Sequence, residues 1–309
     1  MPGLIDSSGS DMAFSSRIAS MISSARKPPS RDLPRWEASD GSERAEKEEA
    51  ARTATAKFLL STASTAVLEW EEFLFGLPDS EWMMAAAMMK VGHFEQGLVR
   101  FLERACGPDS GYVEVGASYG TVFLPAVRRI RPGGWAEAWE PEPLSRDYLI
   151  KNAHLNGHEE SSWLRVIAAA AGKTEGERTL CVSRKTRTHS SFWLDGEQTL
   201  ERMEVLVRRL DKVYQRPIDV LKIDAEGAEW DVLEGARGLL DAGLIRGAVV
   251  EFGPSNLLRA GMAPGDFLSA LEGLGGKMAF IHRLEGALEK YDRGRALECY
   301  SANLFIDFS

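Results

Sequence analysis

Short apolar runs alternate with amphipathic segments from residue 107 onward. The segments 118–130, 144–156 and 229–240 carry apolar residues at helical spacing and are predicted to be helices. The apolar runs around them are predicted to be strands, at 111–115, 135–139, 163–168, 219–224 and 247–252. Such alternation is typical of a mostly parallel sheet with right-handed crossovers. The pattern therefore predicts one α/β domain over residues 107–309.

Two regions depart from this alternation. An insertion at about 172–214 contains the strand-like pieces ERTLCVS and VLVRR. The segments 277–283 and 300–308 have no long helix between them, so they are expected to form an antiparallel hairpin at the sheet edge. Pro125 falls inside the first predicted helix and is expected to kink it, because proline lacks the N–H that a helix interior needs.

The first 106 residues have a different character. Residues 1–41 are rich in Ser, Arg, Pro and Gly with little periodicity, which is typical of a disordered arm. Ser42 is a suitable helix-capping residue, and alanine-rich sequence with early glutamates follows it. We therefore expect a helical extension over residues 42–106, with one helix to about Phe75 and a second from about Glu81 to Ala105.

Charge and cysteine content narrow the class of protein. The net charge of the 309 residues is −9, which disfavours nucleic acid as a partner because its phosphates are normally met by a basic stripe. The 3 cysteines are scattered without a C-x-x-C spacing, so neither a disulfide framework nor a structural zinc site is expected. A reducing compartment, the cytoplasm, fits this usage best.

No membrane span is expected either. The longest strongly apolar stretch near the front, WMMAAAMMKV, is well short of the roughly 20 residues that a membrane helix needs. The segment MAFSSRIASMISSARK has the amphipathic, Ser/Arg-rich character of a transit peptide, although Asp6 and Asp11 precede it. A targeting role for this segment remains an alternative to a cytoplasmic arm.

Candidate chemistry lies where strands of the predicted sheet end, because ligands of doubly wound sheets bind at the carboxyl edge. The first strand runs into VEVGASYG, where Gly116 and Gly120 let a ligand approach the backbone, although an ordinary strand-to-helix turn reads the same way. The second strand ends at Glu140, where an acid can accept both hydroxyls of a ribose. Together these features indicate an adenosine-containing ligand, with a nicotinamide cofactor and S-adenosylmethionine both open.

The segments EVGASYG, EPEPLSRDYLIKNAHLNG and VLKIDAEGAEW, taken in this order and spacing, resemble the FkbM family of S-adenosylmethionine-dependent methyltransferases. The resemblance runs from about residue 111 to 255, and KIDAEGAE is its most specific block. It implies the Rossmann-like class I fold, with a seven-stranded, mostly parallel sheet. Two positions depart from the family pattern: Glu114 stands where Asp is common, and Ser118 where Asn is common.

The resemblance also implies site residues. Those expected to bind the cofactor are Glu114, Gly116, Ala117, Ser118, Gly120, Glu140, Pro141 and Asp224. The catalytic candidates are Asp224, Glu226, Glu251 and His189, because removing the proton of a hydroxyl acceptor needs a base near the carboxyl edge. Glu251 and His189 are inferred from their positions in the sequence rather than from the resemblance, and an exposed loop histidine without a role is the alternative for His189. Glu229 begins the next helix and is interpreted as a cap. No metal ligand is assigned, since a hard cation wants more oxygen ligands than Asp224 and Glu226 supply, but divalent-metal binding stays open.

The expected function is S-adenosylmethionine-dependent methylation, with O-methylation of a small-molecule or sugar hydroxyl implied by the resemblance. A methyltransferase-fold module that binds but does not catalyse is the alternative, although the types of Gly116, Gly120, Glu140 and Asp224 are all retained. A nicotinamide-dependent oxidoreductase is disfavoured, because the third glycine of the dinucleotide fingerprint is missing.

Overall fold

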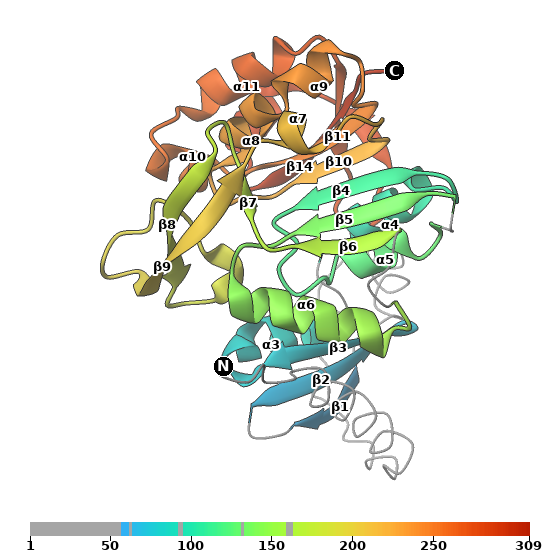
Figure 1. Cartoon of the computed structure of the whole chain (residues 1–309), viewed down its shortest axis with the longest axis vertical. Coiled ribbons are helices and arrows are strands. Elements are labelled where there is room, and N and C mark those ends of the chain that lie inside the picture. Colours follow the sequence, from blue (N-terminus) through green and yellow to red (C-terminus); the bar gives the residue numbers. More distant parts are fainter. Residues whose placement is uncertain (1–56, 62–63, 92–94, 131–132, 159–162) are drawn as a thin grey trace, which may run out of the picture.

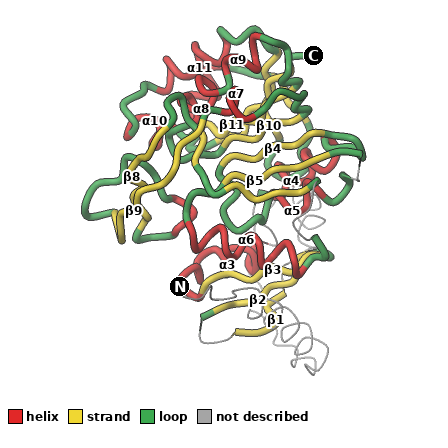
Figure 2. The backbone as a smooth tube through the Cα atoms, in the orientation of Figure 1, coloured by secondary structure: helices red, strands yellow, loops and turns green. Residues whose placement is uncertain are grey.

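A central eight-stranded sheet organises the protein (Figures 1 and 2). The computed structural model describes residues 57–61, 64–91, 95–130, 133–158 and 163–309, so the predicted arm at 1–41 lies outside the described residues. The strand order is β13-β12-β14-β11-β10-β4-β5-β6. The bounds are β4 Gly111–Val115, β5 Trp135–Trp139, β6 Leu164–Ile167, β10 Val220–Ile223, β11 Gly247–Phe252, β12 Lys277–Ile281, β13 Leu288–Lys290 and β14 Ala302–Asp307.

The predicted α/β architecture is confirmed. Strands β6, β5, β4, β10 and β11 pair in parallel, and every residue of β4 and β10 is buried. A strand covered on both faces has no polar side to alternate with, which explains the continuous apolar runs. The C-terminal part differs slightly from the prediction. β12 and β14 are antiparallel neighbours, but β14 lies between β11 and β12, and β13 forms the outer edge.

Helices cover both faces of this sheet. One apolar core joins one face to α4 (Gln96–Ala105), α5 (Phe123–Val127) and α6 (Pro143–Leu155). A second core joins the other face to helices of the C-terminal half. These are α7 Leu210–Val213, α8 Glu229–Gly235, α9 Arg237–Asp241, α10 Pro254–Arg259, α11 Pro264–Glu272 and α12 Arg293–Glu298.

The helix predicted at 118–130 is much shorter than expected. It begins only at Phe123, so Pro125 lies in its first turn rather than in its interior. The first N–H groups of a helix have no partner within the helix, so proline is tolerated there without a kink.

The insertion forms a small second sheet beside the main one. Its strands are β7 (Ala170–Ala171), β8 (Gly176–Ser183) and β9 (Thr199–Arg208), in the order β7-β9-β8. The predicted strand character of ERTLCVS and VLVRR is confirmed. The loop between β8 and β9 carries a short 3-10 turn, Arg187–His189.

The prediction of a helix up to Phe75 is wrong for the described part of the extension. Residues 57–78 form an antiparallel three-stranded sheet of β1 (Lys57–Ser61), β2 (Thr65–Trp70) and β3 (Phe73–Pro78). Trp70 pairs directly with Phe73, and Glu71 takes a left-handed conformation with φ 51°, which makes a tight hairpin turn. The second predicted helix is present as two, α3 (Trp82–Val91) and α4, after the short turn Asp79–Glu81.

Helix α6 joins the small N-terminal sheet to the main domain, and Figure 1 shows it between the two. Asn152 accepts a hydrogen bond from the N–H of Gly76 and donates to the carbonyl of Gly76. Asn156 does the same with both backbone groups of Leu74. The two amides thus replace a neighbouring strand and satisfy part of the open edge of β3, which would otherwise be a liability.

Within the described residues, no helix is both long and apolar enough to cross a membrane.

Candidate functional site

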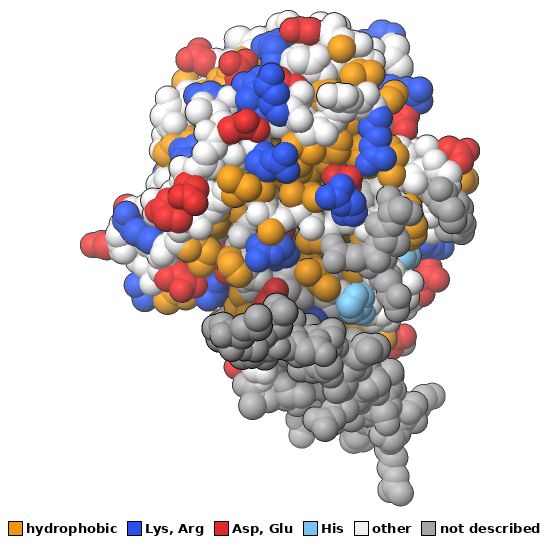
Figure 3. All heavy atoms as spheres, in the orientation of Figure 1, with side chains coloured by type: hydrophobic (Ala, Val, Ile, Leu, Met, Phe, Trp, Pro, Cys, Tyr) orange, Lys and Arg blue, Asp and Glu red, His pale blue; other side chains and the backbone are white. Residues whose placement is uncertain are grey.

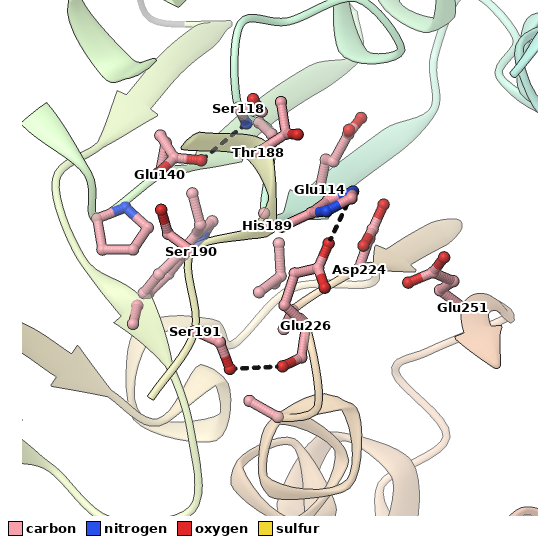
Figure 4. A pocket seen from close by; sticks show the side chains of 18 of the residues that line it. Glu114, Ser118, Glu140, Thr188, His189, Ser190, Ser191, Asp224, Glu226 and Glu251 are labelled. Atoms are coloured by element: carbon pink, nitrogen blue, oxygen red, sulfur yellow. Dashed lines mark hydrogen bonds and ion pairs between the residues drawn. The ribbon is translucent and has the colours of Figure 1, made fainter. Parts of the chain in front are cut away.

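A pocket opens at the carboxyl ends of β4, β5, β10 and β11, under the loop that joins β8 to β9 (Figure 4). Ten of the eleven residues predicted for the site line it. They are Glu114, Gly116, Ala117, Ser118, Glu140, Pro141, His189, Asp224, Glu226 and Glu251. The eleventh, Gly120, lies outside the lining and packs against Leu149 and Leu124 with φ +80°. In Figure 4, Ser118 and Glu140 lie on one side and Glu251 on the other, with His189 and Glu226 between them.

The turn after β4 packs tightly on the end of β10. Gly116 has φ +81°, and a Cβ there would lie 1.8 Å from the carbonyl oxygen of Asp224. Its N–H donates to the carbonyl of Trp139 on β5. Only glycine fits this place, because any side chain would push two strand ends of the pocket apart. Ser118 follows with φ 47°, and its Oγ is buried without a hydrogen-bond partner among the described residues.

Glu140 ends β5 and is buried in the pocket wall. Its Oε2 accepts from the N–H of Ser118 at 2.7 Å, and its Oε1 accepts from the N–H of Glu142 at 2.8 Å. Burial raises the pKa of Glu140 to about 7, and the two backbone donors oppose that rise. The carboxyl group is therefore fixed in orientation, and each oxygen keeps a lone pair for a further donor.

A buried ion-pair chain links β4 to β10. Lys222 Nζ lies 3.2 Å from Glu114 Oε1 and 3.1 Å from Asp224 Oδ2, and Tyr112 donates to Glu114 Oε2. Burial opposes the charge of Lys222, but Asp224 and Glu114 hold its pKa above the usual value. Burial raises the pKa of Glu114, and Lys222 opposes this rise. Lys222 thus neutralises two acids and orients Asp224 at the strand end.

Glu226 and His189 meet in the middle of the pocket. Glu226 takes φ 51° in the loop after β10 and accepts from Asn256 Nδ2 at 2.6 Å. His189 Nε2 lies 3.9 Å from Glu226 Oε1. Burial, followed by the charge of Asp224, raises the pKa of Glu226 to about 9. The His189 side chain is 54% exposed, but its partial burial still lowers its pKa, so the neutral imidazole that can take up a proton prevails near pH 7.

Glu229 is a capping residue, as interpreted from the sequence, and does not line the pocket. Its side chain accepts hydrogen bonds from the N–H groups of Ala225 and Gly227. These bonds hold the tight loop that carries Glu226. The three carboxylates of the KIDAEGAE block therefore differ in environment: Asp224 is paired with a lysine, Glu226 faces the pocket, and Glu229 supports the loop.

Two parts of the site were not predicted. The first is Glu95, which precedes α4, adopts φ 55° and lines the pocket from the extension. The second is Arg187 in the loop over the pocket, which ion-pairs with Glu142 and Glu201. Neither residue stands at the end of a predicted strand, so no sequence signal marked it.

The loop over the pocket is held from several directions. Glu81 of the extension accepts from Arg187 N at 2.8 Å and from Thr186 Oγ1 at 2.5 Å. On the far side, Ser191 Oγ donates to the carbonyl of Glu226 at 2.7 Å. Because these bonds tie the insertion both to the extension and to the β10 loop, the pocket is roofed by segments from three parts of the chain.

No group of three or more His, Cys, Asp or Glu side chains is placed to hold a metal ion in the part of the chain that the structure describes.

Comparisons with known proteins identify the family. The methyltransferase FkbM domain matches residues 114–278, more than half of the chain. A search of curated proteins finds no match. Similar solved structures include the methyltransferase FkbM from Methylobacillus flagellatus KT, at 15% identity and TM-score 0.41, with 65% of this chain and 44% of that chain covered. This chain thus spans less than half the length of that relative.

Two further similar structures are those of an rRNA methylase and of TrmK. An rRNA methylase from Streptococcus thermophilus is 11% identical at TM-score 0.40, with 68% of this chain and 92% of that chain covered. TrmK of M. capricolum, in complex with S-adenosyl-homocysteine, is 12% identical at TM-score 0.34, with 68% and 66% covered. From the domain match, this chain belongs to the FkbM family of methyltransferases.

Proposed function

We propose that the protein transfers a methyl group from S-adenosylmethionine to a hydroxyl oxygen of a small molecule. The observation that carries the proposal is that a single pocket holds two groups of residues. Gly116 and Glu140 at one end suit an adenosine, and acids at the carboxyl ends of β10 and β11 line the other. A methyl donor and an acceptor must share one pocket, because the acceptor oxygen attacks the methyl carbon in line.

The residues present fit the cofactor. Because Gly116 has no side chain, the turn after β4 can pack directly on the end of β10. The buried Ser118 Oγ has no hydrogen-bond partner among the described residues. Glu140 is oriented by two backbone donors and retains accepting capacity for ribose hydroxyls. When bound, S-adenosylmethionine supplies an electrophilic methyl group on a sulfonium. Gly116, Ala117, Ser118, Glu140, Pro141 and the Glu114–Lys222–Asp224 chain are the residues that we expect to hold it.

His189 is the proposed base for the acceptor hydroxyl. Its pKa is lowered by burial, so the neutral imidazole that takes the proton prevails near pH 7. The charge of Asp224 favours the imidazolium that forms, whereas Glu226, 3.9 Å away, is largely protonated near pH 7 and adds little charge. The loop that carries His189 is tied to Glu81 and to the Glu226 carbonyl, which restrains the ring over the pocket and limits the entry of water.

A small acceptor suits the pocket better than nucleic acid does. Six carboxyl groups line the pocket, and those that are ionised would repel phosphates; they are Glu95, Glu114, Glu140, Asp224, Glu226 and Glu251. On the face drawn in Figure 3, basic and acidic side chains are interspersed and form no continuous basic stripe among the residues described there.

Calorimetric titration with S-adenosylmethionine, S-adenosylhomocysteine and NADH tests the cofactor. We expect micromolar binding of the first two, none of NADH, and a loss of about tenfold or more in Glu140→Ala, because one buried acceptor pair is removed. Absence of binding to both methyl compounds by folded wild-type protein would contradict the proposal. Binding without methyl transfer to any hydroxyl in a broad panel of acceptors would instead indicate the non-catalytic module.

A further inference from the structure

One end of the pocket is acidic without a matching cation. Its two Lys or Arg side chains are Lys222 and Arg187. Lys222 is engaged by Glu114 and Asp224, and Arg187 by Glu142 and Glu201, both outside the pocket lining. Glu226 has His189 nearby. Among the described residues, Glu95 and Glu251 form no ion pair within 4 Å that would neutralise them.

Glu95 has an unused acceptor atom in this pocket. Its Oε2 is buried and accepts no hydrogen bond from any described residue. Its left-handed backbone, φ 55°, is unfavourable for a residue with a side chain and holds the carboxyl at the start of α4. The side chain of Asn303 lies near the same carboxyl group and lowers its pKa, against the larger rise that burial causes. Glu95 lines the pocket, and an acceptor atom that is buried and unpaired in a pocket wall indicates a missing donor.

Glu251 lies on β11 of the main sheet and lines the same pocket as Glu95. Glu251 pairs in register with Asn303 of β14, the residue that also reaches Glu95. Within the described residues, the one hydrogen-bond donor to Glu251 is Ser301 Oγ, at 3.0 Å. Both carboxyl groups thus lie near Asn303. Glu95 precedes the matched family domain, and Glu251 is close to the end of β11.

The fold does not profit from this arrangement. Burying a carboxylate without a cation or a full set of donors destabilises a protein, and two such groups near each other are worse. Burial, then the charge of Asp224, raises the pKa of Glu95 to about 7 and that of Glu251 well above its usual value. A ligand with a positive charge and N–H donors would supply the hydrogen bonds and the counter-charge that these two carboxyl groups lack in the free protein.

We propose that the acceptor carries a protonated amine beside its reactive hydroxyl, and that Glu95 and Glu251 bind this ammonium group. The inference rests on the proposed function and names its substrate class: amino alcohols such as amino sugars. An ammonium has three donors, which suit the free Glu95 oxygen and the Glu251 carboxyl. The hydroxyl of such a compound is then presented towards Asp224, Glu226 and His189.

Proton release should accompany binding. Several charged or titratable groups act on the two acids or line the pocket with them. They are Glu114 on β4, Lys222 on β10, Asp224 and Glu226 in the loop after β10, Glu229 at the start of α8, His189 in the roof, and Arg259 on α10, which acts on Glu226. The pKa of Lys222 is raised above its usual value, so the change with pH comes mainly from the acids and His189. An ammonium favours the ionised carboxylates, so its affinity is expected to rise from about pH 6 to pH 8.

The experiment is calorimetric titration of the full chain saturated with S-adenosylhomocysteine, using matched pairs of probes: glucosamine against glucose, and ethanolamine against ethylene glycol. We expect the amine of at least one pair to bind about tenfold or more tightly than its neutral partner. Repeating the titration in buffers of different ionisation enthalpy should show protons released on binding. Equal or preferential binding of the neutral partners, or no saturable binding of either amine at tens of millimolar, would overturn the inference.

Variants separate this inference from the cofactor proposal. Glu95→Gln and Glu251→Gln should each reduce the amine preference about tenfold or more while leaving S-adenosylhomocysteine affinity within about twofold. Glu298→Gln, on the exposed face of α12, is the matched control and should change neither quantity. Retained S-adenosylhomocysteine binding with no amine preference in the wild type rejects the acceptor class alone. Failure to bind S-adenosylhomocysteine rejects the proposed cofactor.

Discussion

Two pairs of glutamates at the pocket have opposite surroundings: Glu140 and Glu229 are buried, and Glu95 and Glu251 are half-buried. Glu140 and Glu229 each receive at least two backbone N–H groups, from the β4 turn and from the loop after β10. Glu95 has an oxygen with no donor among the described residues, and Glu251 accepts from a single serine. The first pair lies inside the matched family domain, whereas Glu95 precedes it.

The contrast teaches how buried charge can be interpreted. A carboxyl group that is saturated by the backbone fixes a loop or a strand end, so its worth lies in the structure. A carboxyl group that is buried in a cavity and left unsaturated lowers the stability of the free protein, so its retention is best explained by a ligand. On this basis the Glu140 side of the pocket is preorganised by the backbone, whereas the carboxyl groups of Glu95 and Glu251 are completed only when a ligand binds.

The largest expected effect comes from converting paired acids into unpaired ones. Lys222→Met leaves Glu114 and Asp224 buried without their cation, which should lower the free energy of unfolding by about 3–5 kcal/mol. Denaturant unfolding measures this change. The control is Arg246→Met, which breaks the exposed Arg246–Asp219 pair and should cost less than about 1 kcal/mol. Similar losses in the two variants would show that the buried chain has no special weight.

A smaller loss is expected when a saturated carboxyl is removed. Glu229→Ala leaves the N–H groups of Ala225 and Gly227 without their acceptor and should destabilise the protein by about 2–3 kcal/mol in the same unfolding assay. Glu234→Ala removes a half-exposed carboxylate from the same helix, whose ion-pair partner among the described residues is Arg237, and should cost below about 0.5 kcal/mol. A neutral Glu229→Ala would remove the distinction between the two pairs of glutamates.

The smallest stability change has the opposite sign. The pKa of Glu95 is raised from 4.5 to about 7, chiefly by burial, so the unfolded state releases this proton first and the carboxyl destabilises the fold progressively between those values. Glu95→Gln removes that dependence. It should be close to neutral near pH 4.5 and more stable than the wild type by about 1–2 kcal/mol near pH 8.

Unfolding curves at both pH values check this prediction. Glu298→Gln again serves as the exposed control, and its stability difference from the wild type should not vary with pH. Were Glu95→Gln to destabilise the protein equally at the two pH values, Glu95 would belong with the saturated carboxyls.

The core strands were predictable because each is a short apolar run bounded by turns, and three of them, β4, β5 and β11, have the predicted bounds. The positions of the candidates at strand ends and the family resemblance together predicted eleven site residues, and ten of these line one pocket. Asn152 and Asn156, in the segment YLIKNAHLN, illustrate what the sequence could not predict. Their motif was visible, but their role as backbone partners of β3 depends on a sheet that is distant in sequence.

The extension was misjudged because local propensity favoured a helix, whereas tertiary contacts made strands. The stretch STASTAVLEWEEFLFG offers alanine, leucine and glutamate, all good helix formers. Pairing of Trp70 with Phe73 and coverage of the β3 edge by α6 outweigh that preference. Glu95 escaped notice for a related reason, since a left-handed residue at a helix start is defined by packing rather than by residue type.

The most direct test compares S-adenosylhomocysteine affinity in Glu140→Gln and Glu251→Gln under identical conditions. If the Glu140 side binds the cofactor and the Glu251 side binds the acceptor, Glu140→Gln should weaken binding by about tenfold or more, and Glu251→Gln should leave it within about twofold of the wild type. Equal weakening in both variants, or an effect confined to Glu251→Gln, would contradict this division of the pocket.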